Sequence, residues 1–112
     1  MERALIAMAL LELDGSLDAS EFHDSAQRAL QEGLGLRVQR EWPLPYRGAR
    51  GRRSGRIDLV VLDSQDRPAF GIELDRRSPR ARSLEKLRRL GVPGLVVMRQ
   101  AARTGRVEAV FV

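Results

Sequence analysis

Two acidic residues lie within segments of the sequence that otherwise have the composition of buried β-strands. Asp58 lies in the apolar run 57–62, and Glu73 lies in the apolar run 69–75. Acidic side chains are depleted in strands, and they are almost never fully buried without a partner. Two such residues in successive strands therefore predict a nearby cation.

The polar stretch 63–68 between the two runs predicts a hairpin turn. In that register Leu62 pairs with Ala69, and Asp58 then lies directly opposite Glu73. Residues opposite each other in an antiparallel pair are about 5 Å apart, a spacing at which like charges are destabilising. A hard divalent cation such as Mg²⁺ would bind both carboxylates. The alternative is a shifted register that leaves one carboxylate at a strand end in solvent.

The composition indicates one small domain with a basic surface. A chain of 112 residues can build a single hydrophobic core. Basic residues outnumber acidic residues by 20 to 15, and every basic residue except Lys86 is an arginine. Such a surplus favours binding to phosphate backbones, for which guanidinium groups are well shaped. The alternative is a coding bias toward arginine.

The rarest residue types exclude several kinds of site. The absence of cysteine excludes disulfides, thiolate catalysis and cysteine-bound zinc. The single histidine, His23, excludes a histidine-rich metal site, and we interpret it as a surface or packing residue that can graze a neighbouring site. The apolar run 4–11 is too short to span a membrane and lacks the flanks of a signal peptide, so we expect a soluble cytoplasmic protein.

Hydrophobic periodicity predicts an α/β fold with a mixed sheet of four or five strands flanked by helices. We expect one domain over residues 1–112, made of an N-terminal helix within 1–15 and a core over 18–112. Pro43 and Pro45 should end the first strand, and the later strand, helix, strand order predicts a parallel crossover. The expected helices are 2–14, 18–33 and 78–90, and the expected strands are 36–42, 57–62, 69–75, 95–98 and 107–112.

This order of elements, with Asp58 in Gly-Arg-Ile-Asp-Leu-Val-Val and Glu73 in Ile-Glu-Leu-Asp, resembles the PD-(D/E)XK nuclease superfamily, which has the restriction-endonuclease-like fold. The resemblance covers residues 21–99. It implies a hydrolase that uses Mg²⁺ or Mn²⁺ to cleave phosphodiester bonds in DNA or RNA. It also implies metal binding by Asp58, Glu73, the backbone carbonyl of Leu74 and Glu21 on the second helix. For Glu21 the alternative is a first-turn residue that only complements the helix dipole.

Asp75 stands where the family has its catalytic lysine. One explanation makes Asp75 a further catalytic or metal-binding group, with the missing cation supplied by Lys86, Arg76 or Arg77. A second is a metal that activates water without a lysine. The third is a catalytically inactive module that binds nucleic acid or protein, within a homodimer or a larger complex. The alternative for Lys86 is a solvent-exposed helix residue without a fixed partner. Arg77 can bind a phosphate, and its alternative is a solvent-exposed residue at the end of a strand.

Five arginines lie between residues 47 and 56, directly before the strand that carries Asp58. The segment has no large apolar residue after Tyr46, so we expect a mobile loop that contacts a nucleic acid backbone. Arginines after the third strand would extend this surface. The residues expected to bind nucleic acid are Arg47, Arg50, Arg52, Arg53, Arg56, Arg76 and Arg80.

Overall fold

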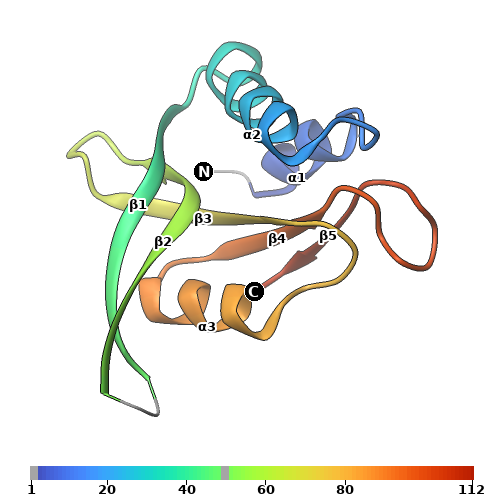
Figure 1. Cartoon of the computed structure of the whole chain (residues 1–112). Helices are drawn as coiled ribbons and strands as arrows, with labels where there is room; N and C mark the ends of the chain where they lie inside the picture. Colours follow the sequence, from blue (N-terminus) through green and yellow to red (C-terminus); the bar gives the residue numbers. More distant parts are fainter. Residues whose placement is uncertain (1–2, 49–50) are drawn as a thin grey trace.

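The computed structural model describes residues 3–48 and 51–112, with only the backbone described for 46–48 and 51–54. Figure 1 shows a sheet with helices on both faces, which confirms the predicted α/β class. The elements in chain order are α1 (Arg3–Leu11), α2 (Ala19–Arg28), the π-helical turn η1 (Ala29–Gly33), β1 (Arg37–Gly48), β2 (Gly51–Leu62), β3 (Pro68–Asp75), α3 (Ala81–Leu90), β4 (Gly94–Met98) and β5 (Glu108–Phe111).

Within the described residues, five strands form one sheet in the order β1-β2-β3-β4-β5. β3 and β4 pair in parallel, and the other neighbouring strands pair antiparallel. The chain passes from β3 to β4 through α3, so the predicted crossover is confirmed. Because the carboxyl ends of β3 and β4 lie at the same edge of the sheet, the segments that follow them meet there (Figure 1).

Both faces of the sheet are packed, as the apolar runs predicted. One core lies between the sheet and the first two helices, where Phe22 of α2 is fully buried against residues such as Leu59 and Leu95. The other lies under α3, where Leu87 packs with Val96. Sheets covered on both faces have strands that are apolar on both sides, which explains the continuous hydrophobic runs.

Local side-chain and backbone chemistry fixes the start of α2 and the end of α3, whereas α1 ends at Leu11, earlier than the expected 2–14. The Asp18 carboxylate caps α2 by accepting a hydrogen bond from the Glu21 N–H at 2.8 Å. Gly91 ends α3 in a left-handed conformation with a φ of +78°, which a residue without a side chain adopts at little cost. None of the described helices is long and apolar enough to cross a lipid bilayer.

The first hairpin differs from the prediction. β1 continues through Pro43 and Pro45 as far as Gly48, because it is an edge strand and its outer side needs no backbone donors. The expected loop is likewise wrong, since 46–48 and 51–56 belong to paired strands. Arg50, one of the predicted nucleic-acid contacts, lies outside the described residues.

The turn between β2 and β3 also changes one predicted pair. Leu62 pairs with Pro68 rather than Ala69, because the register shifts between Val61 and Leu62. The shift is local, and the pairing farther from the turn keeps the predicted register.

Candidate metal centre

Asp58 and Glu73 lie just beyond the last pair of the β2–β3 ladder, which joins Leu59 to Ile72. The Asp58 side chain points toward α2 and the Glu73 side chain toward α3, so the two carboxylates do not face each other across one ladder as the register predicts. The Asp58 N–H donates a hydrogen bond to Glu73 Oε2 at 2.9 Å, and the Leu74 N–H donates one to Asp58 Oδ2 at 2.7 Å. Each carboxylate therefore binds the backbone of the opposite strand, and the two side chains hold the diverging strands together.

The Glu73 carboxylate is fully buried on the side of the sheet that α3 covers. Its Oε1 forms an ion pair with Lys86 Nζ, which lies 2.5 Å away. Burial, and then the charge of Asp58, raises the pKa of Glu73 from 4.5 to about 7, while Lys86 and the Asp58 N–H act in the opposite direction. Glu73 is thus an acid whose charge is costly unless a cation stays beside it.

Lys86 supplies that cation from the middle of α3. Its side chain is buried, and its ammonium donates a second contact, a 2.8 Å hydrogen bond, to the backbone oxygen of Arg56. The structure therefore places the only lysine at Glu73 and not in solvent. Lys86 thus reaches Glu73 from the helix that follows β3.

Asp75, two residues after Glu73, binds the start of α3. Its Oδ1 accepts hydrogen bonds from Arg80 Nε at 2.9 Å and Ser83 Oγ at 3.0 Å. Its Oδ2 accepts one from the Arg80 N–H at 2.9 Å. Both oxygens of this buried carboxylate thus bind the first turn of α3, the helix that carries Lys86.

Asp58 also takes part in a cluster that faces the other side of the sheet. His23 on α2 and Glu41 on β1 each bring a ligand atom near the Asp58 carboxylate, and these atoms all lie within 4.8 Å of one another. Oxygen ligands lie about 2.0 to 2.6 Å from Mg²⁺ or Ca²⁺, so two ligands of one ion are at most about 5 Å apart. The spacing of this cluster therefore fits a divalent cation.

The sequence did not identify Glu41 as a site residue. Glu41 lies opposite Asp58 in the β1–β2 register and has a φ of +56°, which is uncommon for a residue other than glycine. Residues in such conformations are concentrated at functional sites. The one available signal was the break in strand alternation after Arg40, which did not show where the Glu41 side chain points.

The α2 residue that joins this cluster is His23 and not Glu21. Glu21 is exposed in the first turn of the helix, where its N–H binds the Asp18 cap. His23 is half-buried two positions later, on the side of α2 that faces Asp58. The sequence indicated only that His23 can graze a neighbouring site, and the packing of α2 on the sheet places it beside Asp58.

A cavity of about 320 Å³ opens beside the cluster, between α2 and the ends of β3 and β4. His23, Asp58 and Leu74 form part of its lining, and the remaining residues include the arginines 76, 80 and 99 together with Asp75. Arg76 and Arg80 are exposed, whereas the predicted Arg77 lines a different cavity. The acidic cluster is thus bordered by guanidinium groups suited to an anionic ligand.

The arginines of the first hairpin are placed only in part. The backbones of Arg47, Arg52 and Arg53 belong to β1 and β2, and their side chains lie outside the described part of the chain. Arg56 is exposed, and its backbone oxygen accepts the hydrogen bond from Lys86. The hairpin therefore connects directly to the buried ion pair.

Comparisons with known proteins do not identify a relative of this chain. The chain matches no family model, no curated protein and no solved structure. The function is therefore inferred from the chemistry of the cluster and of the residues around it.

Proposed function

We propose that this protein is a metal-dependent nuclease that hydrolyses phosphodiester bonds in DNA. The observation that carries the proposal is the His23, Glu41 and Asp58 cluster, which has metal-ligand spacing and adjoins the buried pair of Glu73 and Lys86. The resemblance to PD-(D/E)XK nucleases supports the same reaction, with Asp58 as a metal ligand and Glu73, paired with Lys86, as a supporting residue. The cytoplasm remains the expected location.

The ligand set favours Mn²⁺ or Mg²⁺. Two carboxylates are the ligands that hard cations prefer, and one imidazole shifts the preference toward transition metals. We expect Mn²⁺ to bind more tightly than Mg²⁺ for that reason. A divalent ion held there would neutralise the phosphodiester and lower the pKa of a bound water.

Residues around the cluster hold it in place. Glu73 accepts a hydrogen bond from the Asp58 N–H, and the Lys86 ammonium neutralises the buried Glu73 carboxylate. The Leu74 N–H fixes one oxygen of Asp58, which leaves the other for a ligand. This second group of contacts orients the site without filling the cavity.

The surrounding arginines would bind and orient the substrate. Arg80 uses Nε to bind Asp75, so its terminal nitrogens can point elsewhere. Arg76 donates from Nε to Gln100 Oε1 at 3.3 Å, which fixes the stem of that guanidinium in the same way. Guanidinium groups whose stems are held lose less freedom on binding a phosphate.

A second function is favoured by the same contacts. Both oxygens of Asp75 bind residues at the start of α3, so this carboxylate is not available to bind a metal. The Lys86 ammonium binds Glu73 and a backbone oxygen, so it is not available to contact an attacking water. A DNA-binding module without catalysis would have this arrangement. It would bind DNA in a salt-sensitive manner without metal.

Cleavage assays on plasmid and single-stranded DNA test the proposal. Wild-type protein should cleave in Mn²⁺ and more slowly in Mg²⁺, and EDTA should stop the reaction. Asp58→Asn should abolish cleavage, whereas Glu32→Gln, an exposed acid outside the cluster, should not change it. Full cleavage by Asp58→Asn would refute the proposal, and metal-independent DNA binding without any cleavage would establish the second function.

A further inference from the structure

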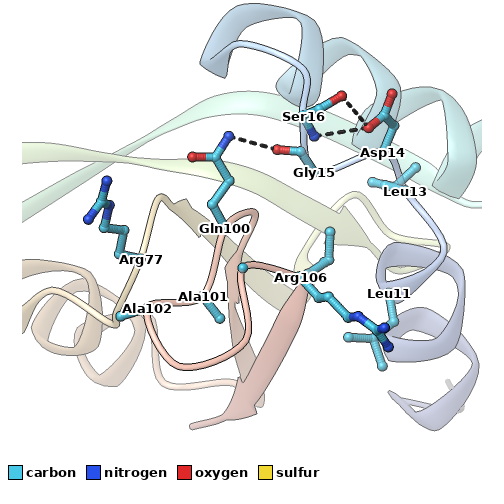
Figure 2. A pocket seen from close by; sticks show the side chains of 12 residues that line it. Leu11, Leu13, Asp14, Gly15, Ser16, Arg77, Gln100, Ala101, Ala102 and Arg106 are labelled. Atoms are coloured by element: carbon cyan, nitrogen blue, oxygen red, sulfur yellow. Dashed lines mark hydrogen bonds between the residues drawn. The ribbon is translucent and has the colours of Figure 1, made fainter.

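A larger cavity, of about 900 Å³, lies at the same edge of the sheet as the candidate metal centre. Figure 2 shows it between the loop that joins α1 to α2 and the segment after β4. Arg77 and Gln100 belong to its lining, and each directly follows a residue of the smaller cavity, Arg76 and Arg99. The two cavities therefore lie on either side of the chain at the carboxyl ends of β3 and β4, where α/β sheets commonly bind ligands.

The wall of this cavity is held by close contacts. A Cβ added to Gly15 would lie 2.1 Å from the Arg99 backbone oxygen, so only glycine permits this approach. Gln100 Nε2 donates to the Gly15 oxygen at 3.1 Å, and Arg99 Nη1 donates to the Leu17 oxygen at 3.2 Å (Figure 2). These contacts bind the α1–α2 loop to the end of β4 and give the cavity a defined shape.

The lining combines apolar surface with two arginines. Leu11, Leu13 and Val107 contribute the apolar part. Arg77 and Arg106 are exposed, and within the described residues neither guanidinium makes a hydrogen bond or an ion pair. Figure 2 shows them at opposite ends of the lining. Such a surface suits a ligand that carries an apolar body and two anionic groups.

Polar groups that could read a base are already used. The Gln100 amide donates to Gly15 and accepts from Arg76. Asp14 accepts both the N–H and the hydroxyl of Ser16, and these hydrogen bonds lower the pKa of Asp14. We expect little discrimination between bases, because few groups remain to form specific hydrogen bonds with them.

We propose that this cavity binds one nucleotide unit, with the base against the apolar lining and the 3′ and 5′ phosphates at Arg77 and Arg106. The choice of a nucleic acid ligand rests on the proposed function. Because the residue before Arg77 lines the metal pocket, the unit would adjoin the phosphodiester that is cleaved. The unit can come from a strand or from a free nucleotide, since both carry the same groups.

Calorimetric titration in EDTA tests this site without the metal. Thymidine 3′,5′-bisphosphate should bind more tightly than thymidine 5′-monophosphate, and the nucleoside should bind least. Loss of one charge-assisted phosphate contact should weaken binding about tenfold, so Arg77→Ala and Arg106→Ala should each weaken bisphosphate binding by about that factor. Arg28→Ala, an exposed arginine on α2 outside this lining, is the matched control and should have no effect.

Three results would overturn the proposal: no binding of the bisphosphate, equal binding of all three compounds, or unchanged binding by both arginine variants. Displacement of the bisphosphate by a 5′-phosphorylated tetranucleotide would identify a strand as the source of the unit. Failure of the tetranucleotide to compete, with bisphosphate binding retained, would identify a free nucleotide.

The same titration separates this site from the nuclease proposal. Asp58→Asn should bind the bisphosphate as the wild type does, although it should not cleave DNA. A protein that cleaves DNA but does not bind the bisphosphate would refute only the nucleotide cavity. A protein that binds the bisphosphate without cleaving DNA would refute only the nuclease.

Discussion

Asp58 and Glu73 lie on neighbouring strands, but their carboxylates point to opposite faces of the sheet and lie in different surroundings. Asp58 is half-buried and opens toward α2, where His23 and Glu41 approach it. Glu73 is fully buried toward α3, where Lys86 lies 2.5 Å from it. The pocket side can accept a ligand, whereas the interior side is already neutralised by the protein. Two acids that look equivalent in the sequence are therefore expected to have separate roles, one in binding and one in support.

The largest expected effect comes from removing the cation on the interior side. Lys86→Met should destabilise the protein by about 3 kcal/mol at pH 9, because the buried Glu73 carboxylate would lose its partner. At pH 6 the cost should be less than half of that, since Glu73 can then stay protonated. Urea unfolding at the two pH values measures both, and the double variant Lys86→Met with Glu73→Gln should recover most of the loss at pH 9. Equal costs at the two pH values would contradict the role of the ion pair.

The pH dependence of the free energy of unfolding of the wild type tests the buried Glu73–Lys86 pair. The pKa of Glu73 is about 7 in the folded protein and 4.5 ordinarily, so the folded state holds the proton more tightly than the unfolded chain does. Stability from this group is therefore present at low pH and is lost as the pH rises from about 4.5 to 7, by about 3 kcal/mol at most. Urea unfolding of metal-free wild type and Glu73→Gln across this range should show that difference, and parallel curves would contradict it.

Metal should stabilise the protein through the pocket side. Mn²⁺ at 100 times its dissociation constant should raise the free energy of unfolding by about 2.7 kcal/mol. His23→Ala and Asp58→Asn should remove most of this gain, because each deletes one ligand of the cluster. Asp24→Asn, an exposed acid on the same helix as His23, should retain it. Thermal unfolding with and without Mn²⁺ measures the gain, and an undiminished gain in His23→Ala would exclude the imidazole as a ligand.

The smallest expected effect concerns the contact between β3 and α3. Ser83→Ala removes a hydrogen bond to the buried Asp75 carboxylate and should cost about 1 kcal/mol in urea unfolding. Asp75 borders the cavity beside the cluster, but both of its oxygens are held by Arg80 and Ser83, so Mn²⁺ affinity should change less than twofold. A large loss of Mn²⁺ affinity in Ser83→Ala would instead place Asp75 on the pocket side of the comparison.

Part of this arrangement follows from the sequence. The period of two in the strands was enough to predict the pairing of Leu59 with Ile72, even though the register shifts near Leu62. It did not show that Asp58 and Glu73 point to opposite faces of the sheet. The Asp18 cap and Gly91 marked helix ends because their chemistry is local. These features depend on neighbouring residues, which the sequence shows directly.

The features that were missed depend on distant contacts. Pro43 and Pro45 are compatible with β1 only because that strand lies at the sheet edge, and strand order is a property of the whole fold. Glu41 reaches Asp58 through a left-handed backbone, which its sequence neighbours do not indicate. Lys86 stood out as the only lysine, but its burial against Glu73 depends on how α3 packs on the sheet.

Anomalous diffraction from crystals soaked in Mn²⁺ tests the central claim most directly, namely that the pocket side of this acidic pair binds a divalent metal. We expect one strong anomalous peak within about 2.0 to 2.6 Å of a His23 ring nitrogen and of carboxylate oxygens from Glu41 and Asp58. The buried Glu73 should keep its contact with Lys86 in the same crystals. No peak at the cluster, or a peak between Glu73 and Lys86 with their contact broken, would contradict this claim.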